Sequence, residues 1–214
     1  MANTSGSAYA LTTFCPIKNG HEGGISNCSS VRKTLQELPE NDASPLAKVP
    51  NTYMARFYIL DDAIFQSYPA KLDKLQSSYL VFTSNFHGEL DTYLAGMWNN
   101  ISEAIRAIWT GCVGFDRVDS ARSFTDYIKK CQLMTTFFFN GSTDDTVEEQ
   151  LKSLFLKQEF SKFVFSHQGM PAEQLLKDFK EFIKYAQPKV LSFPTWKAGV
   201  CSLDGICKDE RPAN

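Results

Sequence analysis

The two clearest secondary-structure signals of the chain lie together in residues 77–108, which are SSYLVFTSNFHGELDTYLAGMWNNISEAIRAI. The stretch Ser77–Ser84 is rich in aromatic and β-branched residues, which predicts a strand. A turn over Asn85–Gly88 follows. Apolar residues then recur at helical spacing, at Leu90, Leu94, Met97, Ile101, Ile105 and Ile108. This stretch therefore predicts a strand, a turn and a long amphipathic helix.

Further elements flank this stretch on both sides. Strands are predicted over Tyr9–Ile17 and Thr52–Leu60, with a helix over His21–Leu38 between them. A fourth strand is predicted over Gln132–Phe139. The order strand, helix, strand, strand, helix, strand is the ferredoxin-like βαββαβ pattern. We therefore expect an α+β fold with an antiparallel ferredoxin-like sheet.

Two additional helices are predicted after the last strand. Thr146 and Glu149 have the spacing of a capping box, which indicates a long helix, and Met170–Glu173 opens a final one. We expect a flexible N-terminus over residues 1–8, one domain over residues 9–187 that includes these helices, and a C-terminal arm over residues 188–214.

Composition excludes several classes of protein. The chain has 214 residues, of which 43% are hydrophobic and 21% charged, as in ordinary globular domains. The net charge of −2 offers no general attraction to nucleic acid. The sequence contains neither a long apolar run of membrane-spanning length nor an N-terminal signal pattern, which predicts a cytoplasmic protein without a membrane span.

Six cysteines are present, and without an export signal we expect them to be reduced. Cys15, Cys112 and Cys131 lie in or beside apolar stretches, which predicts buried free thiols. Cys201 and Cys207 lie in a Gly-containing tail. The three histidines are not at zinc-site spacing from any cysteine, so no metal site is expected.

Three segments resemble a group of uncharacterised bacterial proteins. They are YMARFY at 53–58, YLVFTSNFHGELDTYL at 79–94 and IWTGCVGF at 108–115, and the similarity extends from about Ala10 to about Phe182. The group is related to the dimeric α/β-barrel superfamily, whose ferredoxin-like units bind small molecules; some members are cofactor-free monooxygenases and others haem enzymes. His87 and Gly111 depart from the group's pattern, which has Asp and His there.

Arg56 is the first candidate for a functional residue. Strand alternation places Met54, Arg56 and Tyr58 on one face of the strand. An Arg inside a sheet needs a partner, because an unpaired buried charge is costly. The partner is either an anionic or carbonyl-bearing ligand, or a carboxylate of the protein from among Asp61, Glu89 and Asp91.

Asn85 and His87 are the other candidate catalytic residues. They precede the long helix, whose first N–H groups suit a developing negative charge, and His87 could act as a general base at neutral pH. The alternative is that Asn85 or His87 only caps the helix. Nearby aromatic residues are candidates for contacting a substrate: Tyr53, Tyr58, Phe86 and Trp109.

His167 is the candidate cofactor ligand, because it follows a Phe-rich helical segment where an axial ligand of haem could lie. The sequence contains no CxxCH, GxGxxG, Walker, HExxH or GxSxG motif. By analogy with the superfamily that the sequence resembles, the leading hypothesis is an oxidoreductase of the monooxygenase type, without a cofactor, that acts on an apolar or aromatic substrate. A cyclase or isomerase, and a non-catalytic binder of an apolar ligand or haem, are the alternatives.

A homodimer is expected, because a ferredoxin-like sheet leaves one face uncovered. The aromatic side chains Tyr58, Phe137 and Phe139 on the predicted second and fourth strands are too many to expose to water.

Overall fold

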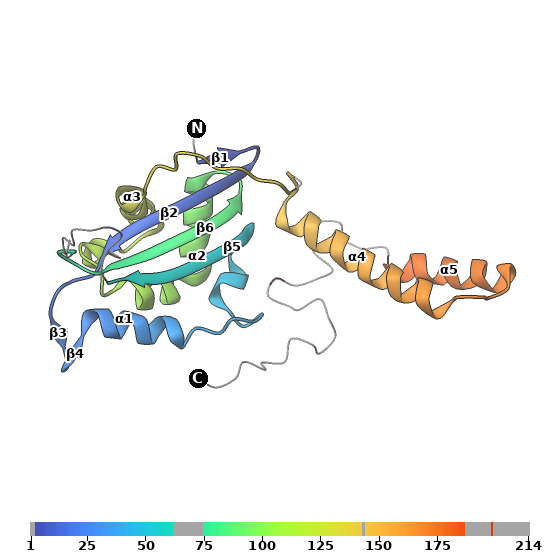
Figure 1. Cartoon of the computed structure of the whole chain (residues 1–214), viewed down its shortest axis with the longest axis horizontal. Coiled ribbons are helices and arrows are strands. Elements are labelled where there is room, and N and C mark those ends of the chain that lie inside the picture. The colour runs from blue at the N-terminus through green and yellow to red at the C-terminus, as the bar shows by residue number, and fades with distance from the viewer. Residues whose placement is uncertain (1–2, 62–74, 143, 187–197, 199–214) are drawn as a thin grey trace, which may run out of the picture. The chain divides into compact units, whose positions relative to one another are not determined.

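The computed structural model describes residues 3–61, 75–142, 144–186 and 198 (Figure 1). Residue contacts divide the chain into two compact units. The sheet unit comprises Met1–Glu40 and Ser44–Asp144, and the hairpin unit comprises Asp145–Asn214 with the short stretch Asn41–Ala43. The two C-terminal helices thus belong to a unit of their own, where we had expected one domain over 9–187. The predicted C-terminal arm, with Cys201 and Cys207, lies outside the described residues.

The sheet unit is built on a four-stranded sheet in the order β1-β2-β6-β5, in which every neighbouring pair is antiparallel. The strands are β1 (Thr4–Ser5), β2 (Ala8–Pro16), β5 (Thr52–Leu60) and β6 (Tyr79–His87). A separate two-stranded hairpin consists of β3 (His21–Glu22) and β4 (Ile25–Ser26). The predicted α+β class and the antiparallel sheet are confirmed.

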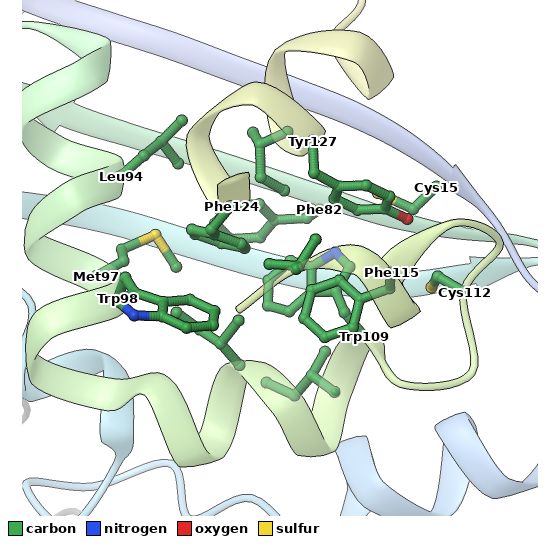
Figure 2. Packing of buried hydrophobic residues seen from close by; sticks show 14 of the residues in the cluster. Cys15, Phe82, Leu94, Met97, Trp98, Trp109, Cys112, Phe115, Phe124 and Tyr127 are labelled. Atoms are coloured by element: carbon green, nitrogen blue, oxygen red, sulfur yellow. The ribbon is translucent and has the colours of Figure 1, made fainter. Parts of the chain in front are cut away.

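The helices of this unit cover one face of the sheet. They are α1 (Asn27–Gln36), α2 (Leu90–Trp109) and α3 (Ala121–Cys131), with short 3-10 turns at η1 (Pro45–Lys48) and η2 (Phe115–Arg117). Alternate residues of β6, Leu80, Phe82 and Phe86, are fully buried against them. Figure 2 shows Phe82 packed among side chains of α2 and α3, including Met97, Trp109 and Phe124. The apolar residues that recur at helical spacing thus form the face of α2 that packs into the core.

The predicted fourth strand over Gln132–Phe139 is not formed. Only the bridge between Thr13 and Gln132 and the hydrogen bond from Leu133 N to Thr12 O (2.8 Å) connect this segment to the backbone of β2. Further along the edge, the carbonyl of Asn3 accepts the N–H of Ala10 (2.8 Å). The N-terminal residues therefore occupy the edge positions that a fourth strand would need.

Residues 3–8, which belong to the N-terminal segment expected to be flexible, are hydrogen-bonded to the sheet in the structure. Asn3 is 2% exposed, and its side chain donates to the carbonyl of Ala10 (2.9 Å) and accepts from the backbone N–H of Thr135 (3.2 Å). One amide side chain thus joins β2 to the segment that follows α3, and β1 pairs with the start of β2.

The first helix is shorter than predicted. The stretch His21–Ser26 forms the β3–β4 hairpin, whose turn uses Gly23 and Gly24 at positive φ (59° and 84°), a conformation that favours glycine. The helix begins after Ser26, whose side chain accepts a hydrogen bond from the backbone N–H of Ser29 (3.1 Å). This N-cap fixes the start of α1 at Asn27.

The hairpin unit contains α4 (Val147–Ser166) and α5 (Ala172–Ala186). As predicted, Thr146 caps α4 by accepting a hydrogen bond from Glu149 N (3.2 Å). Aromatic rings join the two helices, as between Phe163 and Phe182, whose centroids are 5.0 Å apart. No side chain of α4 is fully buried. Among the helices that the structure describes, none combines the length and the apolar character needed to cross a lipid bilayer.

Candidate ligand-binding face

The face of the sheet that points away from α2 carries the candidate site. On β6 this face holds Thr83, Asn85 and His87, which are partly exposed and alternate with the buried Phe82, Ser84 and Phe86. The strand register places Thr12 of β2 and Arg56 of β5 on either side of Thr83. We call this surface, formed by the outward residues of β2, β6 and β5, the open face.

A hollow of about 560 Å³ lies on the open face, in the size range of small-molecule sites. Its polar side chains come from three strands: Thr12 from β2, Thr83 and Asn85 from β6, and Arg56 from β5. Met54, which is 66% exposed, adds an apolar wall. The hollow thus combines hydroxyl, amide and guanidinium groups with apolar surface.

Arg56 is exposed, so the expectation of an arginine buried in the sheet is wrong. Its guanidinium lies over the ring of Tyr58, 5.7 Å from the centroid. It makes no ion pair with any described carboxylate: Asp61 pairs with Arg32, and Asp91 pairs with Lys129. The protein partner that the alternative hypothesis required is therefore not found among the described residues, and the guanidinium is free to contact a ligand.

Asn85 and His87 lie on strand β6, two residues apart on the open face, instead of in a turn. Nδ1 of His87 is 3.0 Å from the hydroxyl of Tyr53. Tyr53 reaches this position because the register of β5 against β6 shifts between Thr52 and Met54. The structure therefore brings His87 and Tyr53 together at one end of the face.

Neither Asn85 nor His87 caps α2, so that alternative is wrong. The N-cap position is held by Glu89, which makes no side-chain capping bond. The backbone N–H groups of His87 and Gly88 are also already used, by Asn51 O (2.9 Å) and Ser7 O (2.8 Å). These two N–H groups, which lie in the segment predicted to be a turn, are therefore not free to stabilise a developing negative charge.

Two of the four aromatic candidates belong to the core instead. Phe86 and Trp109 are both 0% exposed. The ring of Phe86 stacks on that of Tyr93, with centroids 3.7 Å apart, and Trp109 packs edge-on against Phe82 at 5.5 Å. They lie on the helix-covered side of the sheet and cannot contact a ligand on the open face. Of the four, only Tyr58 adjoins Arg56.

His167 lies in the other unit, where it ends α4. Its Nδ1 lies 2.7 Å from the carbonyl of Phe163, and its Nε2 lies 3.5 Å from a carboxylate oxygen of Asp178. The ring also stacks on Phe163, with centroids 4.0 Å apart. Although His167 lines an apolar hollow of about 570 Å³, both ring nitrogens face protein partners. This donor set fits a helix cap and does not fit an axial ligand of haem.

Thr12, Thr83 and Met54 line the hollow and were missed as site residues. Met54 could have been predicted because it alternates with Arg56 on the same strand, and Thr83 because β6 has a clear strand pattern. Thr12 could not, because its place in the hollow depends on how β2 pairs with β6.

Among the described residues, no group of three or more His, Cys, Asp or Glu side chains is arranged to hold a metal ion. Comparisons with protein-family models, curated proteins and solved structures give no match.

Proposed function

We propose that the open face binds a small molecule with an apolar or aromatic body and an anionic or carbonyl end. The observation that carries this proposal is that Arg56 and Asn85 both line the hollow, and that Arg56 forms no ion pair with any carboxylate that the structure describes. A guanidinium offers planar, bidentate hydrogen bonding to a carboxylate or similar group. Tyr58 and Met54 on the same strand face supply apolar contact surface for the rest of the ligand.

A second candidate function is proton-transfer catalysis on such a ligand, as in a cyclase or isomerase. The contact between His87 and the Tyr53 hydroxyl favours it, because a histidine held by a second polar group can act as a general base. Oxidoreductase activity of the cofactor-free monooxygenase type is the third candidate and rests on the family resemblance. The strand order β2-β6-β5, with a helix between β2 and β5 and another after β6, supports a ferredoxin-like relationship.

Replacing Arg56 by leucine should weaken binding of an anionic aromatic probe and leave stability unchanged. A hydrogen bond to a charged group contributes about 1.5–3 kcal/mol, so 1-naphthoate should bind roughly 10- to 150-fold more weakly. The free energy of unfolding should change by less than about 0.5 kcal/mol, because the residue is exposed. Titrations followed by NMR at the amides of Thr83 and Asn85 measure the affinity.

The neutral probe 2-naphthalenemethanol and the variant Arg122→Leu provide the controls for this experiment. Arg122 is an exposed arginine on α3, away from the open face, so its loss should not affect naphthoate binding. The neutral probe should bind Arg56→Leu as well as it binds the wild type. Equal weakening of both probes, or naphthoate binding that leaves the amides of Thr83 and Asn85 unmoved, would contradict the anchoring role of Arg56.

We also propose that the protein forms a homodimer through apolar surface of the sheet unit. Phe137 and Phe139 are 80% and 73% exposed, and Tyr58 is 42% exposed on the open face. Light scattering at micromolar concentration should give the mass of two chains, and Phe137→Asp with Phe139→Asp should shift it toward one chain. A wild-type protein that stays monomeric across the concentration range would rule out the dimer.

A further inference from the structure

Three cysteines that are distant in the sequence meet at one end of the sheet-unit core. Cys15 lies near the end of β2, Cys112 follows α2, and Cys131 is the last residue of α3. Figure 2 shows Cys15 beside the ring of Tyr127, with Cys112 nearby. All three sulfurs interact with Tyr127. The fold thus assembles a cluster of thiols around one phenol, which we call the thiol cluster.

Backbone pairing along β2 creates the thiol cluster. The antiparallel bridge between Thr13 and Gln132 holds the end of α3 beside β2, so Cys131 lies next to the strand that carries Cys15. A second bridge, between Ile17 and Cys112, attaches the loop after α2 to the same strand. Cys15 therefore lies between two segments that each carry a further thiol.

Within the cluster, Cys15 and Cys131 form the close pair. Each of the two thiols is the strongest electrostatic partner of the other, and the hydroxyl of Tyr127 also acts on Cys131. Cys15 is 0% exposed, whereas Cys131 is only partly buried. Cys131 is thus partly exposed to solvent, whereas Cys15 is enclosed in the core.

The pKa values of the two thiols also differ, and the more exposed residue has the lowered one. Hydrogen bonding from Cys15 lowers the pKa of Cys131, with further contributions from the Tyr127 hydroxyl and the charge of Lys130. The hydrogen bond with Cys131 and burial raise the pKa of Cys15. Burial raises the pKa of Cys112 to about 12. Since the thiolate is the nucleophile, Cys131 is the member of the cluster prepared to react first.

We propose that Cys131 and Cys15 form a peroxide-responsive pair, in which Cys131 is oxidised first and Cys15 then closes an intramolecular disulfide. The backbone bridge between Thr13 and Gln132 already holds the two residues near each other, so that the sulfurs need only rotate and approach to bonding distance. The oxidant is a peroxide, and the product links the end of α3 to β2. This site is independent of the ligand proposed for the open face.

The reaction balances in two steps. The Cys131 thiolate attacks one peroxide oxygen; an S–O bond forms, the O–O bond breaks, and hydroxide leaves and takes up a proton to become water. The Cys15 sulfur then attacks the sulfur of the sulfenic acid; an S–S bond forms, the S–O bond breaks, and the proton of Cys15 leaves with hydroxide as a second water. Two thiols lose two electrons in total, and hydrogen peroxide is reduced to two waters.

Peptide mapping of the full chain tests this proposal. Trypsin places the three thiols in separate peptides, residues 1–18, 107–117 and 131–152. After hydrogen peroxide treatment and alkylation of remaining thiols, we expect residues 1–18 cross-linked to 131–152, with Cys112 alkylated once the protein is denatured. Dithiothreitol should reverse the cross-link, which distinguishes a disulfide from higher oxidation.

Cys112→Ser is the matched control, because it removes a buried thiol of the same cluster without touching the pair. It should leave the cross-link intact, while Cys131→Ser should abolish it and leave Cys15 reduced. Near-ultraviolet circular dichroism establishes that each variant is folded. A cross-link that involves Cys112, or irreversible oxidation of Cys131 with Cys15 still a free thiol in the wild type, would overturn the proposal.

Discussion

Replacing Trp109 by alanine should lower the free energy of unfolding by about 3–5 kcal/mol, the range for truncating a large buried aromatic residue. Trp109 is 0% exposed, and its ring meets Phe57, Phe82 and Phe124 with centroids 5.4–5.7 Å away. The side chain therefore joins the last turn of α2 to two strands and to α3. Its removal leaves a cavity in the core, which adds to the loss of buried apolar surface.

Urea unfolding followed by circular dichroism measures this effect as a lower midpoint with an unchanged slope. Phe165→Ala is the control, because Phe165 is 80% exposed on α4 and its truncation removes little buried surface. That variant should change stability by less than about 0.5 kcal/mol. Equal losses for the two variants would mean that Trp109 is not the central residue of the core.

The strand β6 and the helix α2 were predictable because each combines a strong local preference with an unbroken apolar pattern. The error lay in the boundary. Strand β6 continues through Asn85 and His87, which the sequence assigned to a turn, because Ala8 and Ala10 of β2 pair with them. The pairing of a strand with a segment far away in the sequence cannot be predicted from the local residues alone.

The edge of the sheet could not be predicted for a related reason. The segment Gln132–Phe139 has the composition of a strand, but the N-terminal residues compete for the same side of β2. Which segment pairs depends on the buried side chain of Asn3, whose hydrogen bonds to Ala10 and Thr135 are non-local. The sequence pattern shows that each segment favours a strand, but it does not show which of the two pairs with the edge of β2.

For the candidate site, the side of the strand on which Arg56 lies could be predicted from the sequence, but its exposure to solvent could not. Alternation placed Arg56 with Met54 and Tyr58, but exposure depends on whether another element covers that face. Phe86 and Trp109 could have been assigned to the core from the sequence. Phe86 alternates in phase with the buried Phe82, and Trp109 lies four residues after the buried Ile105.

Substitutions at Gly111 should be strongly destabilising, in proportion to their size. A methyl group at this position would lie 2.7 Å from Cγ2 of Val31, which is 3% exposed on α1. The carbonyl of Gly111 also accepts the N–H of Lys18 (2.9 Å), so the loop cannot easily move away. Gly111→Ala should lower the free energy of unfolding by about 1–3 kcal/mol, and Gly111→His, which adds a much larger side chain, by more than about 3 kcal/mol.

A double-mutant cycle with Val31→Ala identifies the cause of this loss. Val31→Ala removes the methyl group that an added Cβ would meet, so Gly111→Ala should be less harmful in that background than in the wild type. The coupling should be at least about 0.5 kcal/mol, the lower limit for residues in contact. Tyr127→Phe serves as the uncoupled background, because no atom of Tyr127 is among those that a methyl group at Gly111 would approach. If Val31→Ala gives no relief, then backbone conformation requires glycine at this position, and close packing of α1 on this loop is not what excludes larger side chains.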